Sequence, residues 1–586
     1  MVKMEKKYKY KVKLLLGMLL VSGLSQAEPL PFSETGKYCE TPSRCLNPIT
    51  THVMVTSPNY LATQAGLDVL HQGGNAVDAA IAVASTLAVV YPQMNTIGGD
   101  NFWIIYNSKT KEIKGLNASG RSGSLATIAF YKQQGLDKIP SRGYLAANTV
   151  PGVVSGWDEA YQYASKSMNN SLPWNKLFDS AINYAEHGFA VSPSLNYWST
   201  VNIDTKDKEF RDLKRFDEFK KVFLKNDGEV YQIGEILKQP DLATSLKSIA
   251  NDGATVFYRG NIAQKIVADL KRHGGVLTLD DFANHKATWV SPIHVNYRQY
   301  TAYNLPPNTQ GMASLEILNI LNNFDVKSLG EGSADYYHLI IEATKQAFVD
   351  RDKYLTDPDF NPIPLEFLLS SQHGQEQAKQ IDMQTARIDI KPLDPKGDTV
   401  WFGVVDAQGN AVSIIQSIYH DFGSGIVAKD TGILLQNRGS FFSLDPNHIN
   451  RLEPNKRTFH TLNPAMLFKE GAPYLVYGTM GGEGQPQTQA AIVTRIVDFN
   501  LSPQDAINAP RWLHGRTWGA SSNDLKIEGR VAKNIIDTLK SRGHNVKVVD
   551  DYTDTMGHAG AILIDADNHR LMGATDPRGD GLAAGY

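Results

Sequence analysis

Cysteine is almost absent from this chain, since Cys39 and Cys45 are the only two in 586 residues. Two thiols without histidines at ligand spacing beside them argue against a cysteine-based metal site. A surplus of either charge is also missing, because 58 Lys and Arg residues face 61 Asp and Glu residues, for a formal net charge of -3. This balance argues against nucleic acid or an anionic membrane as the main partner.

Long internal hydrophobic runs are missing as well. The longest, residues 76–91, is rich in alanine, carries Asp78 and ends at Pro92, so it predicts a buried helix rather than a membrane span. At the N-terminus, six lysines precede a short apolar stretch from Leu14 to Leu24, which closes on Ser25-Gln26-Ala27. This pattern is typical of a secretory signal peptide over residues 1–27.

Such a leader predicts a periplasmic or secreted protein in an oxidising compartment. The two cysteines lie close together in an irregular segment, so we expect a local disulfide between Cys39 and Cys45. No cysteine directly follows the cleavage site at Ala27, so no stable membrane anchor is expected after signal removal. The alternative interpretation is a disordered basic tail on a cytosolic protein.

What the sequence does contain is a change of periodicity along the chain. Helical spacing dominates from about residue 145 to residue 369, and a polar, irregular stretch over 374–395 predicts an exposed connector. The period then changes to two over 399–405 and 411–418, which predicts a β-hairpin around the turn 406–410.

The register of this hairpin brings two hydroxyls together. If Val405 pairs with Ala411, Thr399 lies directly opposite Ser417, with their Cβ atoms about 5 Å apart. The second hydroxyl could then orient the first through a hydrogen bond. The inference requires an odd-numbered loop, and two facing hydroxyls can also be ordinary sheet residues.

Several motifs in order resemble the gamma-glutamyltransferase family, and they span nearly the whole chain after the leader. Those of the C-terminal part are Gly397-Asp398-Thr399, Phe422-Gly423-Ser424-Gly425, Gln436-Asn437, Asn455-Lys456-Arg457, Gly481-Gly482, Asp576-Pro577-Arg578 and Gly585-Tyr586. Those of the N-terminal part are Gly73-Gly74-Asn75-Ala76-Val77-Asp78, Val150-Pro151-Gly152, Pro306-Pro307 and Glu342-Ala343.

The resemblance implies an N-terminal nucleophile hydrolase with a four-layer αββα sandwich, an α/β (α+β) fold. The precursor would cut itself between Asp398 and Thr399 into a large subunit, 28–398, and a small subunit, 399–586, which form a heterodimer around one shared core. Thr399 would be the nucleophile, with its freed α-amine, of reference pKa about 7.7 to 8.0, as base. Ser417 would orient it, and neither cofactor nor metal is implied.

The resemblance also assigns the oxyanion hole to the backbone N–H groups of Gly481 and Gly482. Taken alone, this pair of glycines could equally be a tight turn.

The sequence departs from the family where the donor's charges are usually bound. After Gln436-Asn437, where a glutamine and then acidic residues are typical, the chain reads Arg438-Gly439-Ser440-Phe441, so the acidic partner is lost and a cation is gained. Tyr419 replaces a typical asparagine. His460-Thr461 replaces a pair of serines, and Arg121 lies out of register with the arginine that usually binds the donor carboxylate. We therefore expect Arg438, Tyr419, Phe441, His460, Thr461 and Arg121 to form the substrate pocket.

An arginine beside aromatic rings suits a carboxylate without an accompanying ammonium. The alternative is that Arg438 pairs internally with an acidic residue. A lid of only residues 444–453 predicts an open site that favours hydrolysis over transfer.

The expected activity is cleavage of a gamma-glutamyl or similar amide or peptide, by hydrolysis or by transfer to an amine, with glutathione-type substrates if the family activity is kept. The altered pocket also resembles the branch that contains oxamate amidohydrolases and cephalosporin acylases, so oxamate- or glutaryl-type amides are an alternative. A catalytically silent exported scaffold and a metal-dependent hydrolase are the competing classes.

Overall fold

The computed structural model describes residues 47–169, 171–203, 211–388, 398–515 and 522–586. The predicted signal peptide, Cys39 and Cys45, and most of the stretch directly before Asp398 lie outside these residues. Among the described helices, none has the length and apolarity needed to cross a membrane.

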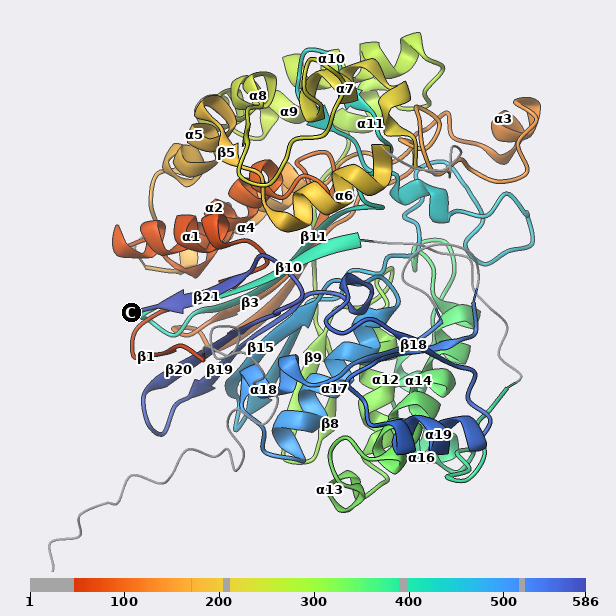
Figure 1. Cartoon of the computed structure of the whole chain (residues 1–586). Coiled ribbons are helices and arrows are strands. Elements are labelled where there is room, and N and C mark those ends of the chain that lie inside the picture. Colours follow the sequence, from red (N-terminus) through yellow and green to blue (C-terminus); the bar gives the residue numbers. More distant parts are fainter. Residues whose placement is uncertain (1–46, 170, 204–210, 389–397, 516–521) are drawn as a thin grey trace, which may run out of the picture.

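Two antiparallel sheets of seven strands form the centre of the molecule (Figure 1). Sheet I has the order β21 (Leu582–Gly585), β2 (Met54–Ser57), β10 (Asp398–Val405), β11 (Ala411–Tyr419), β3 (Asp100–Asn107), β4 (Glu112–Ala118) and β7 (Thr288–Val290). Sheet II has the order β1 (Ile49–Thr50), β20 (Arg570–Thr575), β19 (Ala559–Asp565), β15 (Ala472–Thr479), β14 (Ala465–Lys469), β9 (Tyr300–Asn304) and β8 (Ile293–Tyr297). Both sheets combine strands from before and after residue 398, so the two parts of the chain share one core.

Helices cover the outer face of each sheet. Over sheet I lie α1 (Tyr60–His71), α2 (Ala76–Val90), α4 (Val153–Ser167), α5 (Asp179–His187), α6 (Pro193–Ile203), α7 (Asp217–Phe223), α8 (Pro240–Asp252), α9 (Thr255–Tyr258), α10 (Asn261–Arg272) and α11 (Leu279–Ala283). Over sheet II lie α12 (Gly311–Leu321), α13 (Val326–Leu329), α14 (Ala334–Tyr354), α16 (Ser371–Ala378), α17 (Gly484–Val497), α18 (Pro503–Asn508) and α19 (Lys533–Ser541). This arrangement confirms the predicted αββα sandwich.

The predicted buried helix is α2, every residue of which is buried. It begins at a capping box in which the Asn75 side chain accepts from the N–H groups of Val77 and Asp78, while the Asp78 carboxylate accepts from the Asn75 N–H.

Two expectations need correction. Strands β7, β8 and β9 interrupt the helical region, and part of the predicted connector is α16. Beyond α16, the His338 ring bonds to the carbonyl of Asp382, and Lys345 Nζ donates to the carbonyl of Arg387.

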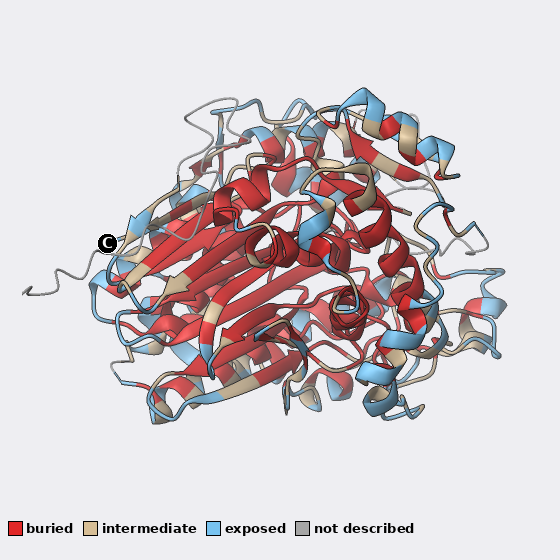
Figure 2. Cartoon of the chain, turned by 90° about the horizontal axis from the view of Figure 1, so that it is seen from below, coloured by how far each residue is buried: buried red, intermediate tan, exposed pale blue. Residues whose placement is uncertain are grey.

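Trp401 fixes how the two sheets pack. Its indole lies over two glycines of sheet II: a Cβ added to Gly478 would be 2.2 Å from Trp401 Cδ1, and one added to Gly560 would be 2.5 Å from Cζ3. The indole N–H donates to Ser413 Oγ at 3.0 Å on the neighbouring strand. The strands of both sheets are buried along most of their length, as Figure 2 shows.

We predict that Gly478→Ala lowers the free energy of unfolding by about 1–3 kcal/mol, because the new methyl group must displace the indole. The measurement is urea unfolding in a Thr399→Ala background, which keeps one chain. Trp401→Leu should relieve the overlap, so the double variant should lose less than the sum of the two single losses. Strictly additive losses would contradict this packing.

Candidate active site

Thr399 lies at the start of β10, which runs without interruption across the predicted cleavage point. Its side chain is 1% exposed, and its Oγ1 has no hydrogen-bond partner among the residues that the structure describes. A buried hydroxyl without a partner is unfavourable in a folded protein and calls for an explanation. It leaves this oxygen available for chemistry.

The predicted hairpin register is confirmed over most of its length. Val405 pairs with Ala411 across a five-residue turn, and the register holds back to Val400, which pairs with Gln416. A shift between Asp398 and Val400 then pairs Asp398 with Tyr419 and leaves Thr399 without a paired residue. The prediction that Thr399 lies directly opposite Ser417 is therefore wrong, because this irregularity adds a residue to one strand.

Ser417 instead pairs with Asp100 of β3 on the other side of β11. Its Oγ accepts hydrogen bonds from the Tyr419 N–H at 2.8 Å and from Arg438 Nη2 at 3.3 Å. Tyr419 has a φ of +82°, a left-handed conformation that is unusual for a bulky residue. Ser417 thus connects the start of the hairpin with Arg438.

Arg438 is 1% exposed, and no residue in the described parts of the chain forms an ion pair with it. Its Nη1 donates to Thr461 Oγ1 at 3.2 Å, and its Nε has no partner. The guanidinium lies 4.3 Å from the centre of the Tyr419 ring and 5.6 Å from that of Phe441. Burial lowers the pKa of Arg438 to about 10, so it remains charged at neutral pH. Internal pairing, the alternative considered above, is not found.

Asp100 and His460 lie behind this arginine. Asp100 accepts hydrogen bonds from the Gly120 N–H at 3.0 Å and from Gln436 Nε2 at 3.0 Å, and its carboxylate lies 3.2 Å from His460 Nε2. Burial raises the pKa of Asp100 to about 6, although Arg438 opposes the shift. Burial and then Arg438 hold the pKa of His460 well below its usual range, so His460 is neutral.

The predicted substrate residues therefore separate into two groups. Arg438, Tyr419, Phe441 and Thr461 are in contact, with His460 behind them, whereas Arg121 is engaged elsewhere. Its guanidinium pairs with Asp357 at 3.0 Å and Asp359 at 2.6 Å. Asp100 was not predicted from the sequence as a site residue. Its position directly after Gly98-Gly99 was the one sequence feature that could have indicated it.

A cavity of about 360 Å³ adjoins this cluster. Tyr419, Phe441 and Phe459 form an aromatic wall, and Arg351 and Asp352 add charge. Residues 444–445 and 448–450 of the short lid line the cavity as well. The aromatic wall therefore separates the Arg438 guanidinium from a space large enough for a small organic group.

Gly481 and Gly482 lie between the end of β15 and the start of α17. Their φ values are +117° and +53°, and their N–H groups donate to no acceptor within the described part of the chain. Because the helix N-terminus carries partial positive charge, this loop is suited to stabilise an anion.

The packing of the two sheets brings the start of β10 toward this loop. A Cβ on Gly403 would lie 3.2 Å from Val476, and one on Gly478 would touch Trp401, so β10 and β15 run in opposite directions across the interface. Thr399 lies two residues before Trp401 on β10, and Met480 lies two residues after Gly478 of β15, in the same direction from this contact. The predicted nucleophile and the predicted oxyanion loop thus lie at the same end of the inter-sheet layer.

One group of described residues has metal-ligand character: His338, Glu342 and His544, whose ligand atoms lie within 4.8 Å of one another. The two imidazoles bond to each other at 2.8 Å, and Lys345 Nζ lies 2.7 Å from the Glu342 carboxylate. A buried ammonium in this place disfavours a further cation, so we assign no metal to the group.

Comparison with known proteins gives matches along almost the whole chain. The family profile described as Gamma-glutamyltranspeptidase matches residues 62–586. The chain is 47% identical to the Glutathione hydrolase-like YwrD proenzyme of Bacillus subtilis (strain 168) over 538 residues, 92% of this chain and 99% of that protein. It is 45% identical to the Oxamate amidohydrolase proenzyme of Klebsiella pneumoniae, with the same coverage. Among solved structures, cephalosporin acylase from Bacillus halodurans matches with a TM-score of 0.84 and 38% identity, covering 93% of this chain and 98% of that chain.

We predict that Asp100 makes the fold less stable as the pH rises from 4 to 7. Its pKa of about 6 in the folded protein exceeds the ordinary aspartate pKa of 3.8, so only the unfolded chain ionises between these values. The stability of the wild type relative to Asp100→Asn should therefore fall across this range, by on the order of 2–3 kcal/mol. Urea unfolding at several pH values measures the difference, and a constant or rising difference would contradict the assignment.

Proposed function

This chain belongs to the gamma-glutamyltranspeptidase family, and from this premise we propose that it cuts itself before Thr399 and then hydrolyses an amide through an acyl-enzyme at that residue. It is an enzyme of the N-terminal nucleophile amidohydrolase class, to which its relatives belong. The observation that carries the proposal is the buried Thr399 hydroxyl, which has no hydrogen-bond partner among the described residues. It lies at the start of an inner strand and at the same end of the sheets as Gly481 and Gly482.

Cleavage begins when Thr399 Oγ1 adds to the carbonyl carbon of Asp398. Collapse of this adduct breaks the Asp398–Thr399 C–N bond, which frees the Thr399 α-amine and leaves Asp398 as an ester on Oγ1. Water then hydrolyses the ester, which releases the Asp398 carboxylate and the Thr399 hydroxyl. This amine then accepts the hydroxyl proton during each turnover, which is feasible because the reference pKa of an α-amine is about 7.7 to 8.0. Ser417 is proposed to act through its contacts with the Tyr419 N–H and Arg438, which fix the chain beside Thr399.

The tetrahedral intermediate carries its negative charge on the former carbonyl oxygen. The N–H groups of Gly481 and Gly482, which have no acceptor among the described residues, are proposed to bind it.

The substrate is proposed to carry a carboxylate on its acyl part, bound by Arg438. The hydroxyls of Thr461 and Ser417 accept from Nη1 and Nη2 of this guanidinium, and its Nε has no partner in the part of the chain that the structure describes. Asp100 acts on this buried charge electrostatically but forms no ion pair with it, so donors of the guanidinium remain for the carboxylate of a ligand. Two relatives named for oxamate and cephalosporin chemistry favour this alternative over a gamma-glutamyl donor, which would also need an acidic group for its ammonium.

The two products, 28–398 and 399–586, are proposed to remain a heterodimer, because each sheet combines strands from both. Export through the 1–27 leader to the periplasm or the medium, with a Cys39–Cys45 disulfide, remains part of the proposal on sequence grounds.

We predict that Thr399→Ala abolishes both cleavage and turnover, because no other hydroxyl replaces the missing nucleophile. Thr399→Ser should retain a measurable part of each. Denaturing gels monitor cleavage, and amide hydrolysis by the purified protein monitors turnover. A wild-type chain that stays whole and hydrolyses no amide would instead favour a catalytically silent scaffold.

We predict that Arg438→Met lowers kcat/KM for a glutaryl amide about a hundredfold, or ~3 kcal/mol, through loss of charge-assisted hydrogen bonds. The matched pentanoyl amide, which lacks the carboxylate, should change less than threefold. Gamma-glutamyl amides and oxamate complete the comparison. Equal losses on the glutaryl and pentanoyl amides, or a wild-type preference for gamma-glutamyl over glutaryl amides, would contradict the assigned role of Arg438.

A further inference from the structure

The oxyanion loop, Thr479–Gly482, rests on a second loop, Met556–Ala559, which we call the backing loop. The Met480 N–H donates to the His558 carbonyl at 2.9 Å, and Thr479 Oγ1 donates to the same carbonyl at 3.1 Å. The two backbones touch: a Cβ added to Gly557 would lie 2.2 Å from Met480 O, and one added to Gly481 would lie 3.3 Å from Gly557 Cα. A displacement of the backing loop must therefore move the oxyanion loop.

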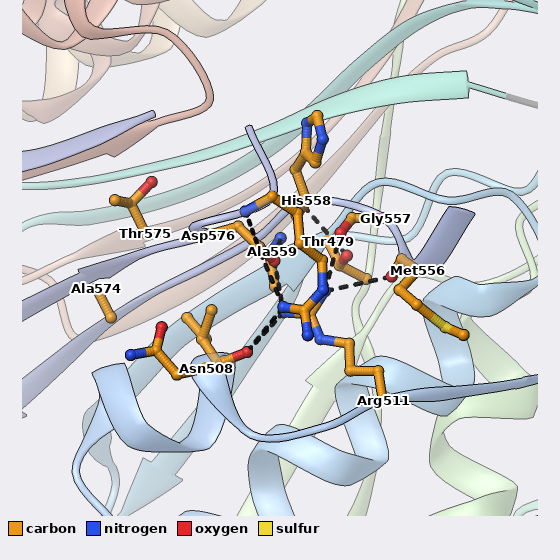
Figure 3. A network of polar contacts seen from close by, with 12 residues as sticks. Thr479, Asn508, Arg511, Met556, Gly557, His558, Ala559, Ala574, Thr575 and Asp576 are labelled. Atoms are coloured by element: carbon orange, nitrogen blue, oxygen red, sulfur yellow. Dashed lines mark hydrogen bonds and ion pairs between the residues drawn. The ribbon is translucent and has the colours of Figure 1, made fainter. Parts of the chain in front are cut away.

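A buried ion pair holds the backing loop from below, as Figure 3 shows. Arg511 Nη1 donates to the carbonyls of Met556 at 3.2 Å and Gly557 at 2.9 Å. Its Nη2 pairs with Asp576, whose carboxylate also accepts from the Ala559 N–H at 2.7 Å. Burial opposes ionisation of Asp576, but Arg511 and Arg578 bring its pKa down to about 2. Both ends of the backing loop are therefore fixed by charged partners.

The His558 side chain ties the backing loop to the other part of the chain. Its Nδ1 lies 3.3 Å from the hydroxyl of Tyr91, at the end of α2, and its Nε2 bonds to Asp554. The Asp554 carboxylate also accepts from the indole N–H of Trp198 at 2.8 Å. Because Tyr91 and Trp198 precede residue 398, these contacts would cross between the two subunits after cleavage.

We propose that Arg511, His558 and Tyr91 are positioning residues that hold the Gly481 and Gly482 N–H groups where the oxyanion forms. The inference rests on the proposed function for its catalytic meaning, whereas the mechanical coupling stands on the contacts alone. Such support is needed because glycine has little intrinsic conformational preference, and an oxyanion donor acts only when it is preorganised. The large subunit thus contributes to a catalytic loop of the small one.

Amide hydrogen exchange in the Thr399→Ala single chain tests the coupling without any activity. Tyr91→Phe and Arg511→Lys should speed exchange in a peptide covering 479–485 by about tenfold, the effect of losing roughly one hydrogen bond of support. Tyr297→Phe is the matched control, because it removes a buried hydroxyl that bonds to Asp498 at the far end of sheet II. Unchanged exchange in both test variants, or an equal change in the control, would overturn the inference even if Thr399 is the nucleophile.

Kinetics of the processed enzyme then test the catalytic meaning. Tyr91→Phe should lower kcat about tenfold, a fraction of the effect of removing an oxyanion donor, and should leave KM within twofold. The Tyr297→Phe control should change neither constant. A change confined to KM would overturn the positioning role. Failure of the proposed function would show itself separately, as amide hydrolysis that survives Thr399→Ala.

Discussion

The structure depends on the position of β10 as an inner strand of sheet I, between β2 and β11. Residues 403–405 of β10 pair with both neighbouring strands, residues 400–402 pair with β11, and Trp401 fixes the strand against sheet II. A chain cut just before such a strand cannot lose its new N-terminus to solvent without unpairing the sheet. The same constraint that makes the fold stable therefore holds Thr399 at the end of the inter-sheet layer, beside the glycine loop.

The site combines several features that are unfavourable for stability. Thr399 Oγ1 and Arg438 Nε are buried without partners in the described part of the chain, Tyr419 has a left-handed backbone, and the pKa of Asp100 is raised to about 6. Such features persist only where the surrounding structure imposes them, and they gather at functional sites. Here they surround one hydroxyl and one cation that forms no ion pair with a described residue, which is consistent with a nucleophile beside a carboxylate-binding group.

Local patterns predicted the local structure, and long-range contacts decided the rest. Alternation and an odd-numbered turn were enough for the hairpin from Val400 to Gln416, and the alanine-rich run with its Asn75 cap was enough for α2. The shift at Thr399 could not be predicted, because no pattern in the sequence marks the extra residue on β11, which there also pairs with β3 of the distant N-terminal part. For the same reason Asp100 was missed, and Arg121 was assigned to the pocket although Asp357 and Asp359, more than two hundred residues away, bind it.

The central claim is that the new N-terminal residue of the small subunit carries the acyl group during turnover. Mass spectrometric peptide mapping of the processed enzyme, quenched in acid during turnover of a slow glutaryl ester, tests it most directly. The account predicts a small-subunit N-terminal peptide that begins at Thr399, with one acyl group on the threonine side chain and a free α-amine. An acyl group on another residue, or a small subunit that begins elsewhere, would contradict it.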